Sequence, residues 1–301
     1  MKQFGLTLIV IFLCLVAFHL LVLKPDKYVQ SDMYEDIIKN EIIKVGINSD
    51  IKPFAFTDSR GNLCGYDVDL AKNIAEYLLN NREAVKFVPV TPENRLLKLS
   101  TGEVDIVIAA MTITPQREKL INFTIPYDNA GQALLVKSTS KITSMADVTG
   151  QNIGVIWGTT AEKNMQNLAP MANVIGFKSY REAYVALKDG AISAITSDDT
   201  ILSGYALGDK DVKLLPKRYT REPYGIGFRK GKGAQKLEHA LNYAINDMKQ
   251  KNIMIRLHKK WIGQEYQEEI PVVQPEENNE IKEDTVEEEK DNLTDTIEET
   301  N

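Results

Sequence analysis

The sequence predicts an α/β protein with two similar lobes, and three observations support that class. Between residues 42 and 263, short apolar runs alternate with stretches of helical periodicity, as they do in α/β proteins. The order helix, glycine, strand and polar residues occurs twice, in "LLKLSTGEVDIVIAAMT" and in "YVALKDGAISAITSDD". A segment of about 230 residues is also long enough to fold around two separate hydrophobic cores.

The first lobe is expected to begin with a strand and to alternate strands with helices. Its predicted strands are 42–48, 85–90 and 104–111, and its predicted helices are 67–80 and 92–102. In the first helix, Val68, Ala71 and Ile74 fall on one face. Asp67 is placed to cap the start of that helix, and Gly102 is placed to stop the next one.

The second lobe is expected to repeat this order. Its predicted strands are 151–156, 173–177 and 191–197, and its predicted helices are 159–168, 179–190 and 198–207. A strand-like run with Gly225 and Gly227 follows, and then a long helical stretch, 234–263, with a buried apolar stripe. Ligand sites in open α/β sheets lie outside the carboxyl ends of the strands, so two facing lobes would turn their polar strand ends toward one cleft.

The start of the chain is apolar. "FGLTLIVIFLCLVAFHLLVL", Phe4 to Leu23, carries no formal charge, and a helix of this length spans about 30 Å, the thickness of a bilayer's hydrocarbon core. No A-x-A-like cleavage site follows it, so we expect residues 1–30 to be an uncleaved membrane anchor, with a cleaved signal as the alternative. Lipid attachment at Cys14 is disfavoured, because Phe12 and Leu13 stand where bacterial lipoprotein signals place small residues.

The end of the chain is acidic. Residues 275–301 contain 9 Glu and 3 Asp against 2 Lys, a net charge of −10, whereas the whole chain carries −6. Such a segment cannot bury enough apolar area to offset the entropy of ordering, so we expect residues 270–301 to be disordered. The rest of the chain is mildly basic, and its two cysteines, Cys14 and Cys64, leave the domain between the ends without an internal disulfide.

Three polar clusters stand at predicted strand ends. They are "TIT" with Arg117, "WGTT" at 157–160 and "TSDD" at 196–199. Together they offer a guanidinium, several hydroxyls, amides at helix starts and a carboxylate. A zwitterionic α-amino acid needs this complement, because its carboxylate suits an arginine and helix-start amides while its ammonium suits an acid.

Each of these residues also has an ordinary structural interpretation. Arg117 could be a surface helix residue that pairs with a carboxylate. Asp198 or Asp199 could cap the helix that follows, and the threonines of "GTT" could cap theirs. Phe54 in "KPFAF" could belong to the hydrophobic core rather than to a ligand-binding surface.

Other chemistries have little support. The chain has 3 His, one in the apolar start and two in the C-terminal helical stretch, so a histidine-based triad or metal cluster is not expected. No glycine-rich loop of the phosphate-binding kind occurs. We therefore expect no catalytic residues, no metal, no cofactor and no nucleic-acid partner.

Six segments resemble one known family and follow one another in its order. They are "KVGINSDIKPFAFTDSRGNLCGYDVDLAKNIAEYL", "STGEVDIVIAAMTITPQREKLINFTIPY", "GQALLVK", "IGVIWGTTAE", "AYVALKDGAISAITSDD" and "EPYGIGFRKG". The family is extracellular solute-binding protein family 3, the polar amino-acid-binding proteins of ABC importers. The resemblance covers residues 42–263 and is strongest to the glutamate- and aspartate-binding subgroup.

The resemblance implies a fold of two lobes, the type II periplasmic-binding-protein fold or Venus flytrap. Lobe one would comprise 42–134 plus 224–263, and lobe two would comprise 135–223. "GQALLVK" and "REPYGIGF" would be the crossover strands that act as the hinge. Closure would add contacts that exist only in the closed state, so the ligand would shift a conformational population without being transformed.

The resemblance also implies a ligand site. Arg117 would clamp the α-carboxylate of an amino acid, with Thr112 and the backbone amide of Thr160 as further donors. Asp198 would accept the α-ammonium group, assisted by the backbone carbonyl of Ala110.

Four more residues complete the expected site. Thr159 belongs to the same "WGTT" segment, and Phe54 lies near the usual aromatic wall. Many members have an acid where this chain has Asn48, which argues against a cationic ligand. "ENR", with Arg95, resembles the "ANR" of glutamate- and aspartate-binding members, and a second arginine in the cleft would suit a side-chain carboxylate. The alternative is that Arg95 only caps or decorates an exposed helix.

We therefore expect a membrane-anchored receptor that binds glutamate or aspartate, with glutamine as the alternative ligand, and delivers it to an ABC permease. Its place would be the extracytoplasmic face of the cell membrane, or the periplasm or medium if the start is cleaved. One rival function is a dehydratase, which this fold also hosts and for which only Asp199 could serve as the acid. A second rival is a ligand-sensing domain for a separate signalling partner.

Overall fold

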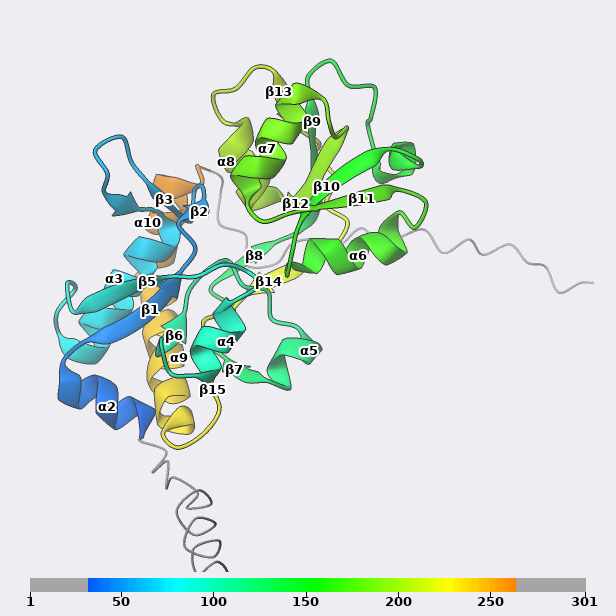
Figure 1. Ribbon diagram of the computed structural model, residues 1–301. Coiled ribbons are helices and arrows are strands. Elements are labelled where there is room, and N and C mark those ends of the chain that lie inside the picture. Colours follow the sequence, from blue (N-terminus) through cyan, green and yellow to red (C-terminus); the bar gives the residue numbers. More distant parts are fainter. Residues whose placement is uncertain (1–31, 264–301) are drawn as a thin grey trace, which may run out of the picture.

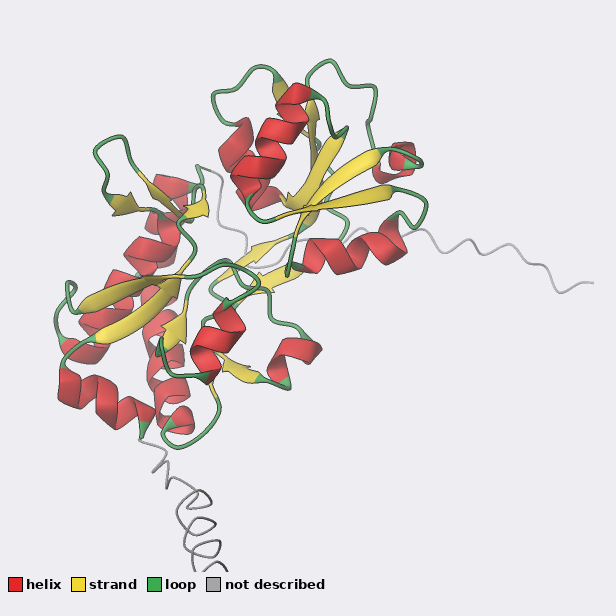
Figure 2. Ribbon diagram, in the orientation of Figure 1, coloured by secondary structure: helices red, strands yellow, loops and turns green. Residues whose placement is uncertain are grey.

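Two lobes, each with its own sheet, make up the protein in the computed structural model, which describes residues 32–263 (Figure 1). The expected anchor or signal at 1–30 and the expected acidic tail at 270–301 lie outside the described residues. Within 32–263, no helix is both long and apolar enough to cross a membrane. Helices flank the sheet in both lobes (Figure 2).

The first sheet has the strand order β5-β1-β6-β15-β7. Its strands are β5 (Val85–Pro89), β1 (Ile43–Ile47), β6 (Ile106–Val107), β15 (Gly227–Arg229) and β7 (Ile121–Phe123). Strand β1 pairs in parallel with β5 and β6, whereas β15 pairs antiparallel with β6 and β7. The first lobe thus contains strands from both ends of the folded chain.

Six helices accompany the first sheet. They are α2 (Met33–Asn40), α3 (Tyr66–Leu79), α4 (Arg95–Ser100), α5 (Pro115–Glu118), α9 (Ala234–Gln250) and α10 (Ile253–Trp261). The helical stretch predicted for 234–263 is two helices, because Asn252 adopts a left-handed backbone with φ 57° between them. Helix α3 starts after Gly65, whose φ is 135° and where a Cβ would lie 2.2 Å from the Phe54 carbonyl oxygen.

The second sheet repeats the design with the order β11-β10-β12-β9-β13. Its strands are β11 (Asn173–Phe177), β10 (Asn152–Ile156), β12 (Ala194–Asp198), β9 (Gln132–Lys137) and β13 (Val212–Leu214). Strand β10 pairs in parallel with β11 and β12, as β1 does with its neighbours, whereas β9 pairs antiparallel with β12 and β13. The repeated sequence pattern therefore corresponds to two lobes of similar topology.

Three helices and one 3-10 turn accompany the second sheet. They are α6 (Thr160–Leu168), α7 (Tyr180–Asp189), α8 (Asp199–Ala206) and η1 (Met145–Val148). Both ends of helix α7 have the residues expected at helix termini. The Ser179 hydroxyl caps the start by accepting from the Glu182 amide at 3.2 Å, and Gly190, with φ 82°, is the C-cap. Helices α6, α7 and α8 all begin just after strands of this sheet end.

The two lobes are joined by a pair of short antiparallel strands, β8 (Asp128–Ala130) and β14 (Glu222–Tyr224). They lie between the lobes in Figure 1. The segment "GQALLVK" was expected to be one of the crossover strands, but most of it forms β9 inside the second sheet. The predicted lobe boundary at 134/135 falls within that strand. The division into lobes 42–134 plus 224–263 and 135–223 stays a prediction.

A small antiparallel sheet extends from the first lobe toward the second. Its strands are β2 (Asp50–Ile51), β3 (Ala55–Thr57) and β4 (Leu63–Cys64). Strand β2 touches helix α7, and the Tyr205 hydroxyl of α8 donates to the Asp50 carbonyl oxygen at 3.0 Å. The lobes are therefore in direct contact away from the joining strands.

Candidate functional site

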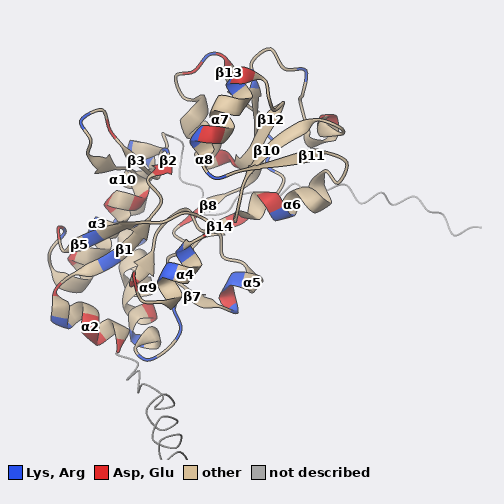
Figure 3. Ribbon diagram, in the orientation of Figure 1, with Lys and Arg blue, Asp and Glu red and all other residues tan. Residues whose placement is uncertain are grey.

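One pocket lies where the two lobes meet, at the carboxyl ends of β1, β6 and β12 and the starts of α4, α6 and α7. All the residues expected to bind the ligand line it except Phe54: Asn48, Arg95, Ala110, Thr112, Arg117, Thr159, Thr160 and Asp198. The strand-end rule for α/β sheets explains this convergence. The basic positions on α4 and α5, which supply Arg95 and Arg117, are marked in Figure 3.

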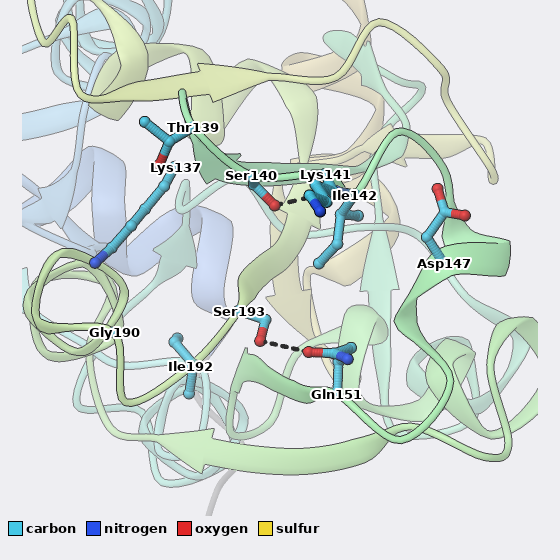
Figure 4. A pocket seen from close by; sticks show the side chains of 10 residues that line it. All are labelled: Lys137, Thr139, Ser140, Lys141, Ile142, Asp147, Gln151, Gly190, Ile192 and Ser193. Atoms are coloured by element: carbon cyan, nitrogen blue, oxygen red, sulfur yellow. Dashed lines mark hydrogen bonds between the residues drawn. The ribbon is translucent and has the colours of Figure 1, made fainter.

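A larger cavity, of about 530 Å³, lies in the second lobe and holds none of the expected residues (Figure 4). It is formed by the loop after β9 and by the turn after α7. Some of its polar side chains bond within the cavity wall, as the Ser193 hydroxyl does to the Gln151 side chain at 2.9 Å. The interlobe pocket is therefore the stronger candidate, although it is smaller.

Arg117 stands on the one-turn helix α5 and reaches across the cleft. Thr114 caps that helix by accepting from the Arg117 amide at 3.3 Å. The guanidinium Nη1 donates to the Thr112 carbonyl at 2.7 Å, and Nη2 donates to the Gly158 carbonyl of the other lobe at 3.2 Å. Burial lowers the pKa of Arg117. No carboxylate within residues 32–263 forms an ion pair with it, so it is not a surface residue in a salt bridge.

Arg95 is buried at the start of α4, with only 4% of its surface exposed. Its Nη1 donates to the Ala109 carbonyl at 3.0 Å, whereas its Nε is buried without a hydrogen-bond partner. Burial, and then the nearby charge of Arg117, lower the pKa of Arg95 to about 9. Arg95 therefore does not decorate an exposed helix; it lines the pocket, and no acid among residues 32–263 forms an ion pair with it.

Asp198 ends β12 and occupies the N-cap position of α8, but its side chain does not cap that helix. Instead Oδ2 accepts from the Tyr224 hydroxyl at 2.6 Å. Burial, and then the charge of Glu222, raise the pKa of Asp198 to about 8. A cation placed beside it would favour the carboxylate form and reverse that shift.

Asp199, the next residue, points elsewhere. Its Oδ1 accepts from the Gly131 amide at 3.0 Å, and its Oδ2 accepts from Arg218 Nε at 2.6 Å. It does not line the interlobe pocket. Its place is beside the strand that enters the second lobe, and it caps no helix by its side chain.

Ala110 and Thr112 form the irregular end of the strand that was predicted as 104–111. The sheet pairing ends early, at Val107, and Ala110 adopts a left-handed backbone with φ 41°. Thr112 is buried and forms an isolated antiparallel bridge with Tyr224. Asn48 follows β1, and its side-chain oxygen accepts from the Asp50 amide at 3.2 Å.

Thr159 and Thr160 begin helix α6. Thr159 holds the N-cap position without a side-chain cap, since its hydroxyl donates to the Ile156 carbonyl at 2.7 Å. Thr160 is the first helical residue, so its amide belongs to the orphan donors of the helix start. These amides and the helix dipole favour an anion at this point.

Phe54, which was expected near an aromatic wall, does not line this pocket. The side chain is fully buried and packs edge-to-face against Tyr66 and Tyr224, at 5.8 and 5.5 Å between ring centres. The aromatic residue that does line the pocket is Tyr180, whose hydroxyl lies 2.7 Å from the Ser197 hydroxyl. The strand-end rule could have identified it, because α7 starts directly after β11.

The lobes touch on two sides of this pocket through glycines. A Cβ on Gly158 would lie 2.9 Å from the Pro92 carbonyl carbon, and a Cβ on Gly204 would lie 2.4 Å from the Lys52 carbonyl oxygen. The free volume of the pocket is about 20 Å³. That volume holds about one water molecule, so a larger ligand can enter only when the lobes separate.

Comparison with known proteins shows to which family the chain is related. The family described as bacterial extracellular solute-binding proteins, family 3, matches residues 43–264. The glutamine-binding protein of an ABC transporter from Bacillus subtilis is 36% identical over 244 residues, which cover 80% of this chain and 89% of that protein. The glutamine-binding protein of Geobacillus stearothermophilus is 37% identical over 198 residues, covering 65% and 76%.

A solved structure is also similar. It is an ancestral amino-acid-binding protein described as a precursor of cyclohexadienyl dehydratase. The two share 34% sequence identity and superpose with a TM-score of 0.70, covering 77% of this chain and all of the other. The two-lobed fold with its interlobe cleft is thus a known one.

Proposed function

The chain belongs to the bacterial extracellular solute-binding proteins of family 3, and on that basis we propose that its interlobe pocket binds a polar α-amino acid for an ABC importer. The observation that carries the proposal is that Arg117 and Asp198 line the same small pocket from its two sides. They come from different lobes, α5 in the first and β12 in the second. A zwitterion is the ligand that uses both charges.

The α-carboxylate is assigned to Arg117. The guanidinium can present two N–H donors to a carboxylate. In the structure, two of its nitrogens donate to the carbonyls of Thr112 and Gly158 instead. The Thr112 hydroxyl and the Thr160 amide are the further donors on either side of the cleft. The α6 start adds its dipole to the same point.

The α-ammonium is assigned to Asp198. The acid lies at the end of β12 with one oxygen bound to the Tyr224 hydroxyl, which leaves acceptor capacity for a cation. The Ala110 carbonyl is the second acceptor, from the opposite lobe. An ammonium there would offset the burial that raises the pKa of Asp198.

Glutamine is the ligand we propose. Both sequence relatives described above are glutamine-binding proteins by name, and neither is named for glutamate or aspartate. Arg95 supplies a donor for the side-chain oxygen of glutamine, because its Nε is buried without a partner. Asn48, which lines the same pocket, can accept from the side-chain NH2 group.

Glutamate, which with aspartate is the ligand that the resemblance favours, is the second candidate because of one observation. The pocket contains two guanidinium groups, Arg95 and Arg117, against the single acid Asp198. A side-chain carboxylate would neutralise the excess charge near Arg95, whose pKa is already lowered by burial and by Arg117. Aspartate would share this charge but is one methylene shorter.

Delivery to a permease, attachment to the membrane by residues 1–30 and exposure on the extracytoplasmic face complete the proposal. The rival dehydratase function has no separate acid in the pocket, since Asp199 is bound to Arg218 and lies outside it. A sensing role would use the same pocket and differ only in the protein partner.

The experiment that tests this function is titration calorimetry with glutamine, glutamate, aspartate and arginine. We expect glutamine to bind most tightly and arginine to be rejected, because its guanidinium would meet Arg95. Tightest binding of glutamate would select the second candidate, and binding of none of the four would overturn the function. Incubation with prephenate or arogenate is expected to yield no product, and pull-down of a permease would exclude the sensing role.

A further inference from the structure

Asp67 was expected to cap helix α3, but the structure gives it a different contact. Gly65 holds the N-cap position, and no side chain caps the helix there. Asp67 is fully buried in the first turn of α3. Its Oδ2 accepts from the Ala110 amide at 3.0 Å, and its Oδ1 accepts from the Tyr127 hydroxyl at 3.1 Å. Neither bond serves the helix to which Asp67 belongs.

The contact falls on the one strained residue of the pocket. Ala110 has φ 41°, a left-handed backbone that is unfavourable for a residue with a Cβ. The residues on either side of Ala110 also form hydrogen bonds: Arg95 donates to the Ala109 carbonyl, and the Gly225 amide donates to the Met111 carbonyl. Among the described contacts, the hydrogen bond to Ala110 itself comes from Asp67 and not from Arg95 or Gly225.

A buried acid is a costly way to hold a turn. Within the described residues Asp67 forms no ion pair, and burial raises its pKa to about 7. A carboxylate nevertheless accepts from an amide more strongly than a neutral group does. The cost makes sense if the Ala110 backbone must stay in one geometry whether the lobes are open or closed.

We propose that Asp67 is a positioning residue of the ligand site: by binding the Ala110 amide it fixes the left-handed turn that presents the Ala110 carbonyl to the ligand's ammonium group. This inference rests on the proposed function, because it assigns the ammonium to that carbonyl. It also makes the first turn of α3 part of the site, although α3 does not line the pocket.

The test compares three variants by ligand affinity. Asp67→Leu removes the acceptor, and we expect it to weaken glutamine binding about tenfold, the effect of losing one hydrogen bond to a charged group. Asp67→Asn keeps an oxygen that can accept from Ala110 and should restore most of that loss. Tyr127→Phe is the matched control, since it removes the other bond to the same carboxylate and should leave affinity nearly unchanged. Equal losses in Asp67→Leu and Tyr127→Phe would overturn the proposal.

A second measurement does not need ligand and covers the case in which Asp67→Leu fails to fold. In the ligand-free protein, the amide proton of Ala110 should resonate downfield by NMR and move upfield in Asp67→Asn, but not in Tyr127→Phe. An unmoved Ala110 amide would overturn the inference. If the parent protein bound no amino acid while the amide moved as expected, the proposed function would fail and the positioning contact would stand.

Discussion

The backbone of Gly204 in helix α8 lies against the Lys52 carbonyl group, although the two residues belong to different lobes. A Cβ at Gly204 would come within 2.4 Å of that oxygen and 2.6 Å of its carbon. Glycine in the interior of a helix costs about 1 kcal/mol relative to alanine. The contact between the lobes accounts for that cost, because a side chain here would hold the lobes apart.

Replacement of Gly204 by alanine should weaken glutamine binding without lowering the stability of the ligand-free protein. Gly204→Ala is expected to leave the ligand-free protein as stable as before or more stable, since alanine favours the helix by up to about 1 kcal/mol. Glutamine affinity should fall about tenfold or more, because the closed state carries the steric clash. Thermal unfolding without ligand and titration calorimetry measure the two effects.

The neighbouring Ser203→Ala is the control for this substitution, because the one hydrogen bond that the Ser203 hydroxyl donates among the described residues is to the Thr200 carbonyl within α8. It should change affinity little. Parental affinity in Gly204→Ala would show that the contact with Lys52 is not needed for closure around the ligand.

We expect Asp198 to release a proton when the amino acid binds. In the closed form, burial and then the charge of Glu222 raise its pKa to about 8, so the carboxyl group of the closed, empty pocket holds a proton at pH 6.5. Binding of an ammonium requires the carboxylate, and affinity should therefore rise with pH by up to tenfold per unit until about pH 8. Calorimetry at pH 6.5 in two buffers of different ionisation enthalpy should detect the released proton. Identical enthalpies in both buffers would contradict the assignment of the ammonium to Asp198.

Arg95 is expected to separate glutamate from glutamine. Arg95→Gln removes a buried positive charge next to the ligand's side chain, so glutamate should lose about tenfold more affinity than glutamine does. Arg95→Lys keeps the charge and is the matched control, for which the ratio of the two affinities should stay near the parental value. Equal losses for both ligands in Arg95→Gln would place the ligand's side chain away from Arg95.

Asp128 should make the ligand-free protein less stable in alkali. It is buried, one of its oxygens has no partner, and burial raises its pKa to about 8. Between its unfolded pKa, near 3.8, and this folded value the native state binds the extra proton, so stability falls as pH rises through that window. Asp128→Asn removes the titration and should raise the unfolding temperature at pH 8.5 but not at pH 5. An equal change at both pH values would contradict the raised pKa.

Much of the candidate site could be predicted from local patterns. Polar residues after strands and before helices mark the carboxyl edge of a sheet, which is why Arg117, Thr160 and Asp198 could be assigned to one cleft before the fold was known. Helix periodicity likewise placed α3 within one residue at each end. The role of these residues as ligand contacts remains a prediction.

The failures have one physical cause, which is packing between residues far apart in the chain. Asp67 satisfies the local rule for a cap, but its partner Ala110 is 43 residues away. Phe54 is an aromatic residue of the kind that can line a ligand site, yet it is packed against Tyr66 and Tyr224 in the aromatic core beside the joining strands. The resemblance places the first crossover in "GQALLVK", whereas the strand that pairs with β14 is β8, which is too short and too polar to be recognised as a strand.

The most direct test of the proposed amino-acid site is the affinity of the Arg117→Ala variant for glutamine, measured by titration calorimetry. The account predicts that affinity falls by at least about a hundredfold, because a bidentate, charge-assisted contact with the α-carboxylate is lost. The ligand-free unfolding temperature should barely change, since Arg117 pairs with no described acid. A dissociation constant equal to that of the parent protein would contradict the assignment of the carboxylate to Arg117 and, with it, the central claim.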